Sequence, residues 1–459
     1  MLEKGKIYEF KIIDVGMNFE GIAKTEQGLT VFIPNALIDE IVEAKITKVN
    51  KSYALGKITK ILVPSFRRNA SDCEYYSQCG GCMARHTTYE NTLDIKMKNA
   101  INTLKKQDVD VTKLQDIYGM GNPYYYRNKV QYPVRQVNDK TVMGMFEAST
   151  HNIIQNSYCL IQDELTDVVA KRLYELVVEN NLLGYDENLG TGDIRNILVR
   201  RGKHTGQIMC VLVVNLATLV ADKRIEKIKD TITREYTDIQ SFVININEKK
   251  TNVILSDNNV CIYGNEYIID YIGDYKFKIT ADSFFQVNTI QAEVLYNVLK
   301  EKLELDKEKT MLELYSGVGS IGVFLANNVK DIYSVEIVES ATMAAKENAR
   351  INGVNNIINV NGDATKETLK LVQQGKHFDY VVVDPPRKGL DLEGIELILK
   401  LKPEKIGYVS CNVATLARDL NILCKSGYEI KDITLVDMFP WTSHVECCSV
   451  LKLKESTEI

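Results

Sequence analysis

The sequence of 459 residues has no long hydrophobic run, no internal repeat and no low-complexity tract. A transmembrane helix needs about 18 consecutive apolar residues, so none is predicted. The first ten residues, MLEKGKIYEF, carry charges but no apolar core, and a secretory signal is therefore not expected. These absences favour a cytoplasmic protein, in which most cysteines are reduced thiols, metal ligands or catalytic groups.

Neither sign of charge is in large excess, because 56 Lys and Arg face 61 Asp and Glu, for a net charge of −5. This balance argues against indiscriminate binding of nucleic acid, although a local basic face remains compatible with it. Hydrophobic residues make up 45% and charged residues 25%, the ordinary mixture of a globular protein. At about 100–200 residues per domain, the length predicts about three domains.

Residues 4–62 are rich in short, alternating, β-branched segments separated by turns, such as GLTVFIP and EIVEAKITKVN. About five strands in so short a stretch predict a small barrel of the oligonucleotide-binding type. The second half of this stretch and the residues after it are basic, with Lys45, Lys48, Lys51, Lys57, Lys60, Arg67 and Arg68. These side chains are interpreted either as RNA ligands or as the lysines that protect a sheet edge.

The pattern changes near Phe284. Strand-like runs predominate from Tyr124 to about Ile272, around a predicted helix at 163–180, and another helix is predicted at 90–107. Beyond Phe284, short apolar runs alternate with helical segments, which indicates a doubly wound parallel sheet of the α/β class. The predicted domains are a barrel over 1–62, a β-rich middle domain over 63–272, with its helix 90–107 packed on the last domain, and an α/β domain over 273–459.

A glycine-rich loop follows the first strand of the predicted α/β domain. ELYSGVGSIG (313–322) has the G-x-G-x-x-G spacing between a strand and a helix. Glycines let the backbone pass close to a nucleotide, and the start of the helix offers free N–H groups. Glu336 ends the next strand, where a carboxylate can bind ribose hydroxyls. The glycine loop and Glu336 together are typical of both NAD and S-adenosylmethionine sites. A strand–helix turn that binds no ligand is the alternative.

Two more carboxylates follow strands of the same predicted sheet. Asp363 ends the third strand, where an acid commonly meets the adenine amine, and Asp384 opens DPPRKG (384–389). The carboxyl edge of such a sheet is the expected ligand crevice. A dehydrogenase has no need of DPPRKG, whereas a methyltransferase that acts on a flipped-out base does.

Cys411, in YVSCN, ends another strand at that edge. A cysteine in a strand is usually a buried apolar residue, but a thiolate is also the best protein nucleophile near neutral pH. Its attack on carbon 6 of a pyrimidine makes carbon 5 nucleophilic toward the methyl group of a sulfonium, and a base must then remove the carbon 5 proton. Glu446 is the predicted base and His444 its competitor.

Three further cysteines have the spacing of a ligand loop, namely Cys73, Cys79 and Cys82, with Gly-Gly inside the last pair. Cys159 is the predicted fourth ligand. Zinc and a four-iron four-sulfur cluster both accept four thiolates, and the spacing does not choose between them; free thiols in a loop are the alternative. The remaining cysteines, interpreted as apolar fillers, are Cys210, Cys261, Cys424, Cys447 and Cys448.

The motifs FFQVN (284–288), LELYSGVGSIG, SVE, DPPRKGL, YVSCN and HVE, in this order, resemble the RNA uracil-5-methyltransferase family over nearly the whole chain. The resemblance implies a Rossmann-like methyltransferase domain, with Cys411 as nucleophile and Glu446 as proton acceptor. The related cytosine-5 enzymes carry a second cysteine where this chain has Pro386-Arg387, so uracil is favoured. The implied S-adenosylmethionine contacts are Gln286, Tyr315, Ser320 (Asn in some relatives), Glu336, Asp363 and Asp384.

The chain resembles in particular the bacterial 23S ribosomal RNA branch of that family. The N-terminal barrel of this branch, the TRAM domain, matches residues 1–62, and its four-iron four-sulfur cluster is held at the positions of Cys73, Cys79, Cys82 and Cys159. The tRNA-modifying branch typically lacks both. The resemblance therefore implies a 23S rRNA methyltransferase with a structural rather than redox cluster; we also expect a monomer and a flipped-out loop uridine as target.

Other predicted RNA contacts are YYYRNK (124–129), whose tyrosines could stack on bases while Arg127 and Lys129 meet phosphates. Arg200, Arg201 and Lys203, and the pair Phe284 and Phe285, are further candidates. For each set a purely structural role is the alternative. The rival functions are a tRNA uracil-5-methyltransferase, an NAD-linked iron–sulfur oxidoreductase, and a cluster-containing RNA-binding or redox-sensing protein without catalysis.

Overall fold

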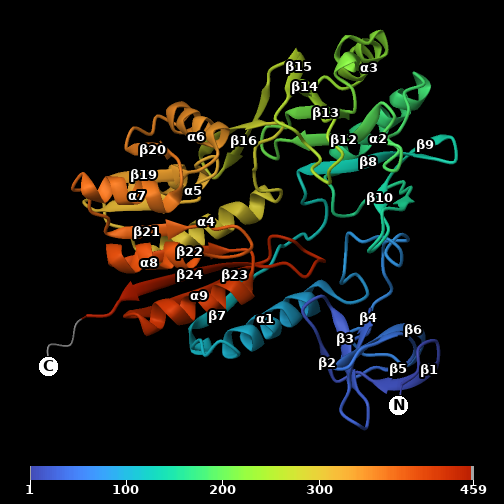
Figure 1. Cartoon of the computed structure of the whole chain (residues 1–459), viewed down its shortest axis with the longest axis horizontal. Helices are drawn as coiled ribbons and strands as arrows, with labels where there is room; N and C mark the ends of the chain where they lie inside the picture. The colour runs from blue at the N-terminus through green and yellow to red at the C-terminus, as the bar shows by residue number, and fades with distance from the viewer. Residues whose placement is uncertain (1, 456–459) are drawn as a thin grey trace.

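The computed structural model describes residues 2–455, which form three β-sheet units with their covering helices (Figure 1). The N-terminal unit is a barrel-like sheet with the strand order β1-β5-β6-β4-β3-β2. Alternate residues of β5, such as Val42, Ala44 and Ile46, point into its core, while Lys45 and Lys48 are exposed. The predicted barrel is thus confirmed. Its strands are β1 (Ile7–Lys11), β2 (Asp14–Val15), β3 (Glu20–Lys24), β4 (Thr30–Pro34), β5 (Ile41–Val49) and β6 (Tyr53–Val63).

The middle unit is a second six-stranded sheet with the order β15-β14-β13-β12-β8-β9. One face packs against α2 and α3, and the residues of β12 and β13 are buried almost without exception because both faces of the sheet are covered. Its elements are β8 (Lys129–Val137), β9 (Lys140–Met143), α2 (Glu164–Glu179), β12 (Ile194–Arg201), β13 (Ile208–Val214), η2 (Ala217–Ala221), α3 (Lys223–Glu235), β14 (Ile239–Ile246) and β15 (Asn259–Gly264). Two small ladders flank it: β10 (Met145–Phe146) with β11 (Ile153–Ile154), and β16 (Tyr267–Ile272) with β17 (Tyr275–Thr280).

The third unit is an eight-stranded sheet with the order β20-β19-β18-β21-β22-β24-β23-β7. Strands β18 to β22 run parallel with helices between them, and β24 is antiparallel to β22 and β23, which confirms the predicted α/β class. The strands are β18 (Thr310–Leu314), β19 (Asp331–Glu336), β20 (Ile357–Asn361), β21 (Tyr380–Val383), β22 (Lys405–Ser410), β23 (Tyr428–Val436) and β24 (Glu446–Leu453). The helices are α4 (Thr289–Leu303), α5 (Ser320–Leu325), η3 (Ala326–Asn328), α6 (Glu339–Ile351), α7 (Ala364–Gln373), α8 (Leu392–Leu401) and α9 (Val413–Lys425).

The eighth strand of this sheet comes from far upstream in the chain. After the barrel, α1 (Tyr89–Lys105) packs on α9, η1 (Val111–Lys113) follows, and β7 (Leu114–Tyr118) pairs in parallel with β23. The sequence did not predict β7, because LQDIY is a short edge strand with three exposed residues and no clear alternation. The boundary between the middle and C-terminal domains at residue 272 stays a prediction. One strand before that boundary, β7, nevertheless belongs to the eight-stranded sheet of the third unit.

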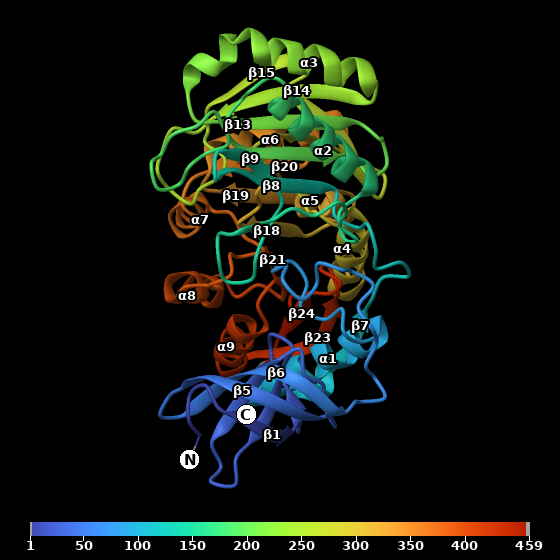
Figure 2. The ribbon, with the colours of Figure 1, turned by 90° about the vertical axis from the view of Figure 1, so that its right-hand side faces the viewer.

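The three units share contacts. The barrel lies beside α1, and the middle sheet lies at the opposite end of the molecule (Figures 1 and 2). Phe19 of the barrel packs with Ala84 and Ile95, while the second face of the middle sheet shares a core with α4 and the β16–β17 hairpin. Among residues 2–455, no helix is both long and apolar enough to cross a lipid bilayer.

Candidate active site

Cys411 lies immediately after β22, at the carboxyl edge of the parallel strands. Asn412 caps α9 by accepting a hydrogen bond from the backbone N–H of Ala414 (3.0 Å), and its amide donates to the carbonyl of Arg387 (3.0 Å). The turn that carries Cys411 is therefore tied to the DPPRKG loop after β21. Burial, together with the nearby carboxyls of Glu446 and Asp384, raises the pKa of the Cys411 thiol, while Arg387 lowers it.

Glu446 begins β24, the antiparallel neighbour of β22. Because Ser410 pairs with Cys447 in this ladder, Glu446 is brought beside Cys411 at the same edge of the sheet. Only 6% of Glu446 is exposed. Burial and then the charge of Asp384 raise the pKa of Glu446 to about 8, against the opposing effect of Arg387. Near neutral pH this carboxyl is therefore able to hold or release a proton, as a general base must.

Asp384 completes a group of three titratable side chains with Cys411 and Glu446. It follows β21 directly, and desolvation raises its pKa to about 7. The competing base, His444, lies two residues before Glu446, and burial followed by Arg387 and Lys96 lowers its pKa. The charges that shift the pKa of the Cys411 thiol are those of Glu446, Asp384 and Arg387.

The glycine loop between β18 and α5 has the backbone shape of a nucleotide cradle. Gly317 and Gly319 have φ values of 54° and 75°, in the left-handed region that favours glycine. A Cβ on Gly319 would lie 2.9 Å from the Cβ of Ala345. Glu336 accepts a hydrogen bond from the N–H of Gly317 (2.9 Å) with one oxygen and from that of Val338 (2.9 Å) with the other, so this carboxylate is fixed beside the loop.

Two residues that support this loop were not singled out in the sequence. Glu313 is a buried acid inside β18 that accepts hydrogen bonds from the N–H of Gly322 (3.0 Å) and from the hydroxyl of Ser334, and burial raises its pKa to about 7. A lone carboxylate in an otherwise apolar strand, MLELY, was the available signal. Tyr296 of α4 shares a hydrogen bond with Ser320 (2.8 Å), a contact between distant segments that leaves no local signal.

The other predicted cofactor-binding residues are held as follows. Asp363 caps α7 by accepting from the N–H of Lys366 (3.0 Å), which leaves one carboxylate oxygen free of that bond. Burial raises the pKa of Tyr315 to about 12, with Asp391 and Asp363 as the nearby acids. Gln286 is buried, and its backbone carbonyl accepts a hydrogen bond from the side-chain amide of Asn128 (3.0 Å). Glu336 ends β19, and Tyr315, Ser320, Asp363 and Asp384 follow the carboxyl ends of β18, β20 and β21, whereas Gln286 precedes α4.

We expect replacement of Glu336 with glutamine to weaken binding of S-adenosylhomocysteine by about 10–100-fold, because hydrogen bonds to a charged group contribute roughly 1.5–3 kcal/mol. Calorimetric titration measures the effect. Glu339→Gln, at an exposed position in the same turn, is the matched control and should bind normally. Equal affinity of Glu336→Gln and the wild type would exclude Glu336 from the site.

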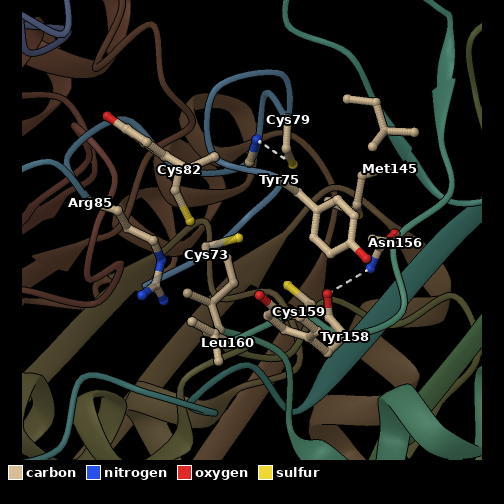
Figure 3. A pocket seen from close by; sticks show the side chains of 14 residues that line it. Cys73, Tyr75, Cys79, Cys82, Arg85, Met145, Asn156, Tyr158, Cys159 and Leu160 are labelled. Atoms are coloured by element: carbon tan, nitrogen blue, oxygen red, sulfur yellow. Dashed lines mark hydrogen bonds between the residues drawn. The ribbon is translucent and has the colours of Figure 1, made fainter. Parts of the chain in front are cut away.

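The four cysteines of the predicted ligand loop line one pocket together with Tyr75, Arg85, Met145 and Tyr158 (Figure 3). Tyr75 shares a hydrogen bond with the hydroxyl of Ser157 (2.9 Å), and the hydroxyl of Tyr158 accepts from the N–H of Glu74 (3.2 Å). These bonds bring the segment with Cys159 against the loop that follows the barrel. Within residues 2–455, no three His, Cys, Asp or Glu side chains are grouped as ligands of a single metal ion.

Several of the predicted RNA contacts are instead structural. Tyr126 is buried and donates to the carbonyl of Pro440 (3.1 Å), and Phe285 is buried. The guanidinium of Arg200 is buried and donates to the carbonyls of Thr280 (3.0 Å) and Ser283 (3.1 Å). Other candidates keep an open surface: Phe284 is 70% exposed, and the barrel lysines are exposed too.

Arg201 and Lys203 form ion pairs with Asp163 at 3.1 and 3.6 Å. Their charges are thus partly neutralised within the protein. Arg200, Arg201 and Lys203 are therefore engaged in contacts within the middle unit, whereas the predicted lysines of the barrel are exposed.

Comparison with known proteins agrees with this arrangement. Residues 88–454 match the family described as tRNA (Uracil-5-)-methyltransferase, and residues 2–59 match the TRAM domain. A protein named as an RNA methyltransferase from Clostridium tetani is 42% identical over 451 residues, covering 97% of this chain and 96% of the relative. Another, from Halalkalibacterium halodurans, is 41% identical, covering 99% of this chain and 98% of the relative.

Among solved structures, the tRNA (uracil-54, C5)-methyltransferase of Pyrococcus abyssi, in complex with S-adenosyl-L-homocysteine, is similar with a TM-score of 0.76 and 25% identity. The similarity covers 97% of this chain and all of that protein. The predicted methyltransferase class is thereby confirmed, and the oxidoreductase alternative is set aside. The chain belongs to the tRNA (uracil-5-)-methyltransferase family of S-adenosylmethionine-dependent RNA methyltransferases and carries an N-terminal TRAM domain.

Proposed function

We propose that the protein, acting as a monomer, methylates carbon 5 of a uridine in 23S ribosomal RNA through a covalent intermediate on Cys411. The observation that supports this chemistry best is the grouping of a thiol and two carboxyls with raised pKa values, Cys411, Asp384 and Glu446, beside the glycine loop. S-adenosylmethionine supplies an electrophilic methyl group on a sulfonium. The residues proposed to hold it are Gln286, Tyr315, Ser320, Glu336, Asp363 and Asp384.

The residues fit such a ligand. A Cβ on Gly317 would meet no atom within 4 Å, so a ligand has room to approach the loop there, and the fixed carboxylate of Glu336 lies where ribose hydroxyls bind in related folds. Desolvation raises the pKa of Asp384 to about 7, so its carboxyl is about half ionised at neutral pH, and a positively charged sulfonium beside it would favour the ionised form.

In the first chemical step, the thiolate of Cys411 forms a bond to carbon 6 of the uracil, and the electrons of the double bond move toward the oxygen on carbon 4. Carbon 5 thereby becomes nucleophilic and accepts the methyl group. The carboxylate of Glu446 then removes the proton from carbon 5. The electrons of that C–H bond restore the double bond to carbon 6, and the sulfur of Cys411 leaves as a thiolate.

The RNA class is proposed on the joint presence of the barrel and the cysteine loop. A tRNA substrate is the second candidate, because the similar Pyrococcus abyssi enzyme is named for tRNA and its match extends over nearly all of this chain. Mass spectrometry of ribosomal RNA fragments and tRNA from a deletion strain, with and without the restored gene, separates the two. We expect a 5-methyluridine to disappear from 23S rRNA alone; its loss from tRNA alone would establish the second candidate.

We propose further that the four cysteines hold a four-iron four-sulfur cluster. The four cysteines line one pocket, and three of them have the spacing of a ligand loop. A cluster binds each thiolate through a different iron atom, so four cysteines arranged around a shared pocket suit it. The expected role is structural, because these cysteines join the loop after the barrel to the segment before α2.

Replacement of Cys82 with serine should remove most of the iron and sulfide from anaerobically purified protein and lower Tm by about 5 °C or more, since a lost structural centre destabilises the fold. Elemental analysis, absorbance near 400 nm and thermal unfolding measure these effects. Cys261→Ser, at a cysteine outside the pocket, is the control. Zinc in place of iron in the wild type would contradict the cluster.

A further inference from the structure

The segment from Asp437 to Val445 connects β23 to β24 and ends immediately before Glu446. Glu446 has no side-chain hydrogen bond to any residue between 2 and 455, so its direction depends on the backbone that carries it. Glu446 itself pairs with Val436 as the first residue of β24, and the residues after it are fixed in the sheet. On its N-terminal side the backbone depends on the conformation of this nine-residue segment, which we call the base loop (437–445).

Lys96 of α1 binds the base loop at three places. Its ammonium donates to the carboxylate of Asp437 (2.6 Å) and to the carbonyls of Phe439 (3.1 Å) and His444 (2.8 Å). An ammonium has three N–H donors, so all of them are used within one loop. The contacts reach the start, the middle and the end of the loop, and the last lies two residues before Glu446.

The partner carboxylate is equally enclosed. Asp437 is 0% and Lys96 3% exposed. The second oxygen of Asp437 accepts from the hydroxyl of Tyr89 (2.7 Å), another residue of α1. A buried ion pair contributes little to stability relative to apolar residues of similar volume, because both charges lose their hydration. Such a pair does impose a defined geometry, here on the base loop against α1.

The opposite side of the base loop is held by backbone contacts. The carbonyl of Trp441 accepts from the N–H groups of Met83 (2.8 Å) and Ala84 (3.2 Å), which follow Cys82, and the indole N–H donates to the carbonyl of Pro123 (3.0 Å). Trp441 has a φ of 67°, a conformation that side-chain-bearing residues rarely adopt and that surrounding contacts must maintain. Asn288, Gln291 and Tyr126 also donate to backbone carbonyls of the base loop, and the guanidinium of Arg85 lies over the Trp441 ring. Among these contacts, Lys96 is the cation that donates hydrogen bonds to three residues of the loop.

We propose that Lys96 is a positioning residue for methyl transfer: it holds the base loop so that the carboxylate of Glu446 faces carbon 5 of the uracil bound to Cys411. This inference rests on the proposed function. Cys411 lies on the β22–α9 turn and has no contact with Lys96, so attack by the thiolate does not depend on this clamp. Removal of the carbon 5 proton does depend on the clamp, because a displacement of the Glu446 carboxylate by about 1 Å can lower the rate roughly 100-fold.

The test compares two variants. Lys96→Met keeps an unbranched side chain that is shorter by one heavy atom, but it leaves Asp437 buried without its counter-charge, which alone destabilises a protein. The double variant Lys96→Met with Asp437→Asn removes both charges while Tyr89 keeps a hydrogen-bond acceptor. Lys98→Met, at an exposed lysine of the same helix that pairs with Asp14 of the barrel, is the matched control.

For each protein we would measure thermal unfolding, affinity for S-adenosylhomocysteine, formation of the covalent adduct with 5-fluorouridine RNA, and tritium release from RNA containing 5-tritiated uridine. The double variant should unfold near the wild-type temperature, bind S-adenosylhomocysteine normally and form the adduct at the wild-type rate. Its release of tritium should be slower by about 10–100-fold, and adduct with ordinary uridine should accumulate. Lys98→Met should match the wild type in all four.

Wild-type tritium release by a folded double variant would overturn the inference, and so would an equal loss of adduct formation and release, since that would indicate a general structural role. If the wild-type protein itself forms no adduct, the proposed covalent mechanism fails instead. The two failures are therefore distinguishable in one set of measurements.

Discussion

Replacing Cys411 with serine is expected to abolish methyl transfer, lowering kcat by roughly 10⁴-fold or more, as loss of a covalent nucleophile typically does. A serine hydroxyl is not ionised near neutral pH, and it is a far weaker nucleophile toward carbon 6 than a thiolate. No neighbouring thiol can take over, because Cys447 and Cys448 on β24 are buried and burial holds their pKa values above the usual range. Transfer of a labelled methyl group to RNA measures the loss.

The same variant should keep its affinity for S-adenosylhomocysteine, which separates loss of the nucleophile from loss of fold. With RNA that contains 5-fluorouridine, the wild type should accumulate an adduct that survives denaturation, since fluorine cannot leave as a proton. Cys411→Ser should form none, whereas Cys210→Ser, deep in the middle sheet, should form it normally. Methylation by Cys411→Ser at a near wild-type rate would refute the covalent mechanism.

Replacing Glu446 with glutamine should trap the enzyme on ordinary uridine. The amide is close to the carboxyl in shape but cannot accept the carbon 5 proton, so addition and methyl transfer proceed while release slows by about 10²–10⁴-fold, the usual contribution of a general base. Denaturing electrophoresis of the RNA–protein adduct measures the trapped fraction. His444→Asn should turn over normally; if it traps adduct while Glu446→Gln does not, His444 is the base.

The pH dependence of release follows from the same carboxyl. Burial raises the pKa of Glu446 to about 8, and only its deprotonated form can accept a proton. The release rate should therefore fall about tenfold per pH unit below 8 and level off above it. Glu446→Gln should lose this dependence. If the release rate of the wild type instead fell only below about pH 4, the carboxylate of Glu446 would be solvated, which would contradict its burial.

Much of the α/β unit could be predicted, because its signals are local. The apolar strand before Cys411 and the capping Asn412 lie next to each other in sequence, and so do β18 and its glycine loop. The edge strand β7 gives no such signal, since partial exposure removes its alternation. The sequence was also insufficient at Arg200. It shows a positive charge there, but it does not show that the guanidinium donates to the backbone carbonyls of Thr280 and Ser283 inside the protein.

The candidate site shows the same limit. Residues that belong to one motif, such as Glu336 at the end of its strand, can be found in the sequence. Lys96 is not, because its partner Asp437 stands 341 positions away and neither residue belongs to a motif. Buried pairs of this kind depend on tertiary packing, which periodicity and spacing do not encode.

The pairing of β7 with β23 also sets the order in which the enzyme is completed on the ribosome. Ile433 is synthesised roughly 300 residues after β7, or about 15–60 s later at 5–20 residues per second. The barrel is synthesised before β7 and the strands of the middle sheet after it, and both are complete in sequence before β23, whereas β7 waits for its partner strand. The strand that begins with Glu446 is inserted last, between β22 and β23. A nascent chain that lacks β24 therefore has neither Glu446 nor the strand that places it beside Cys411.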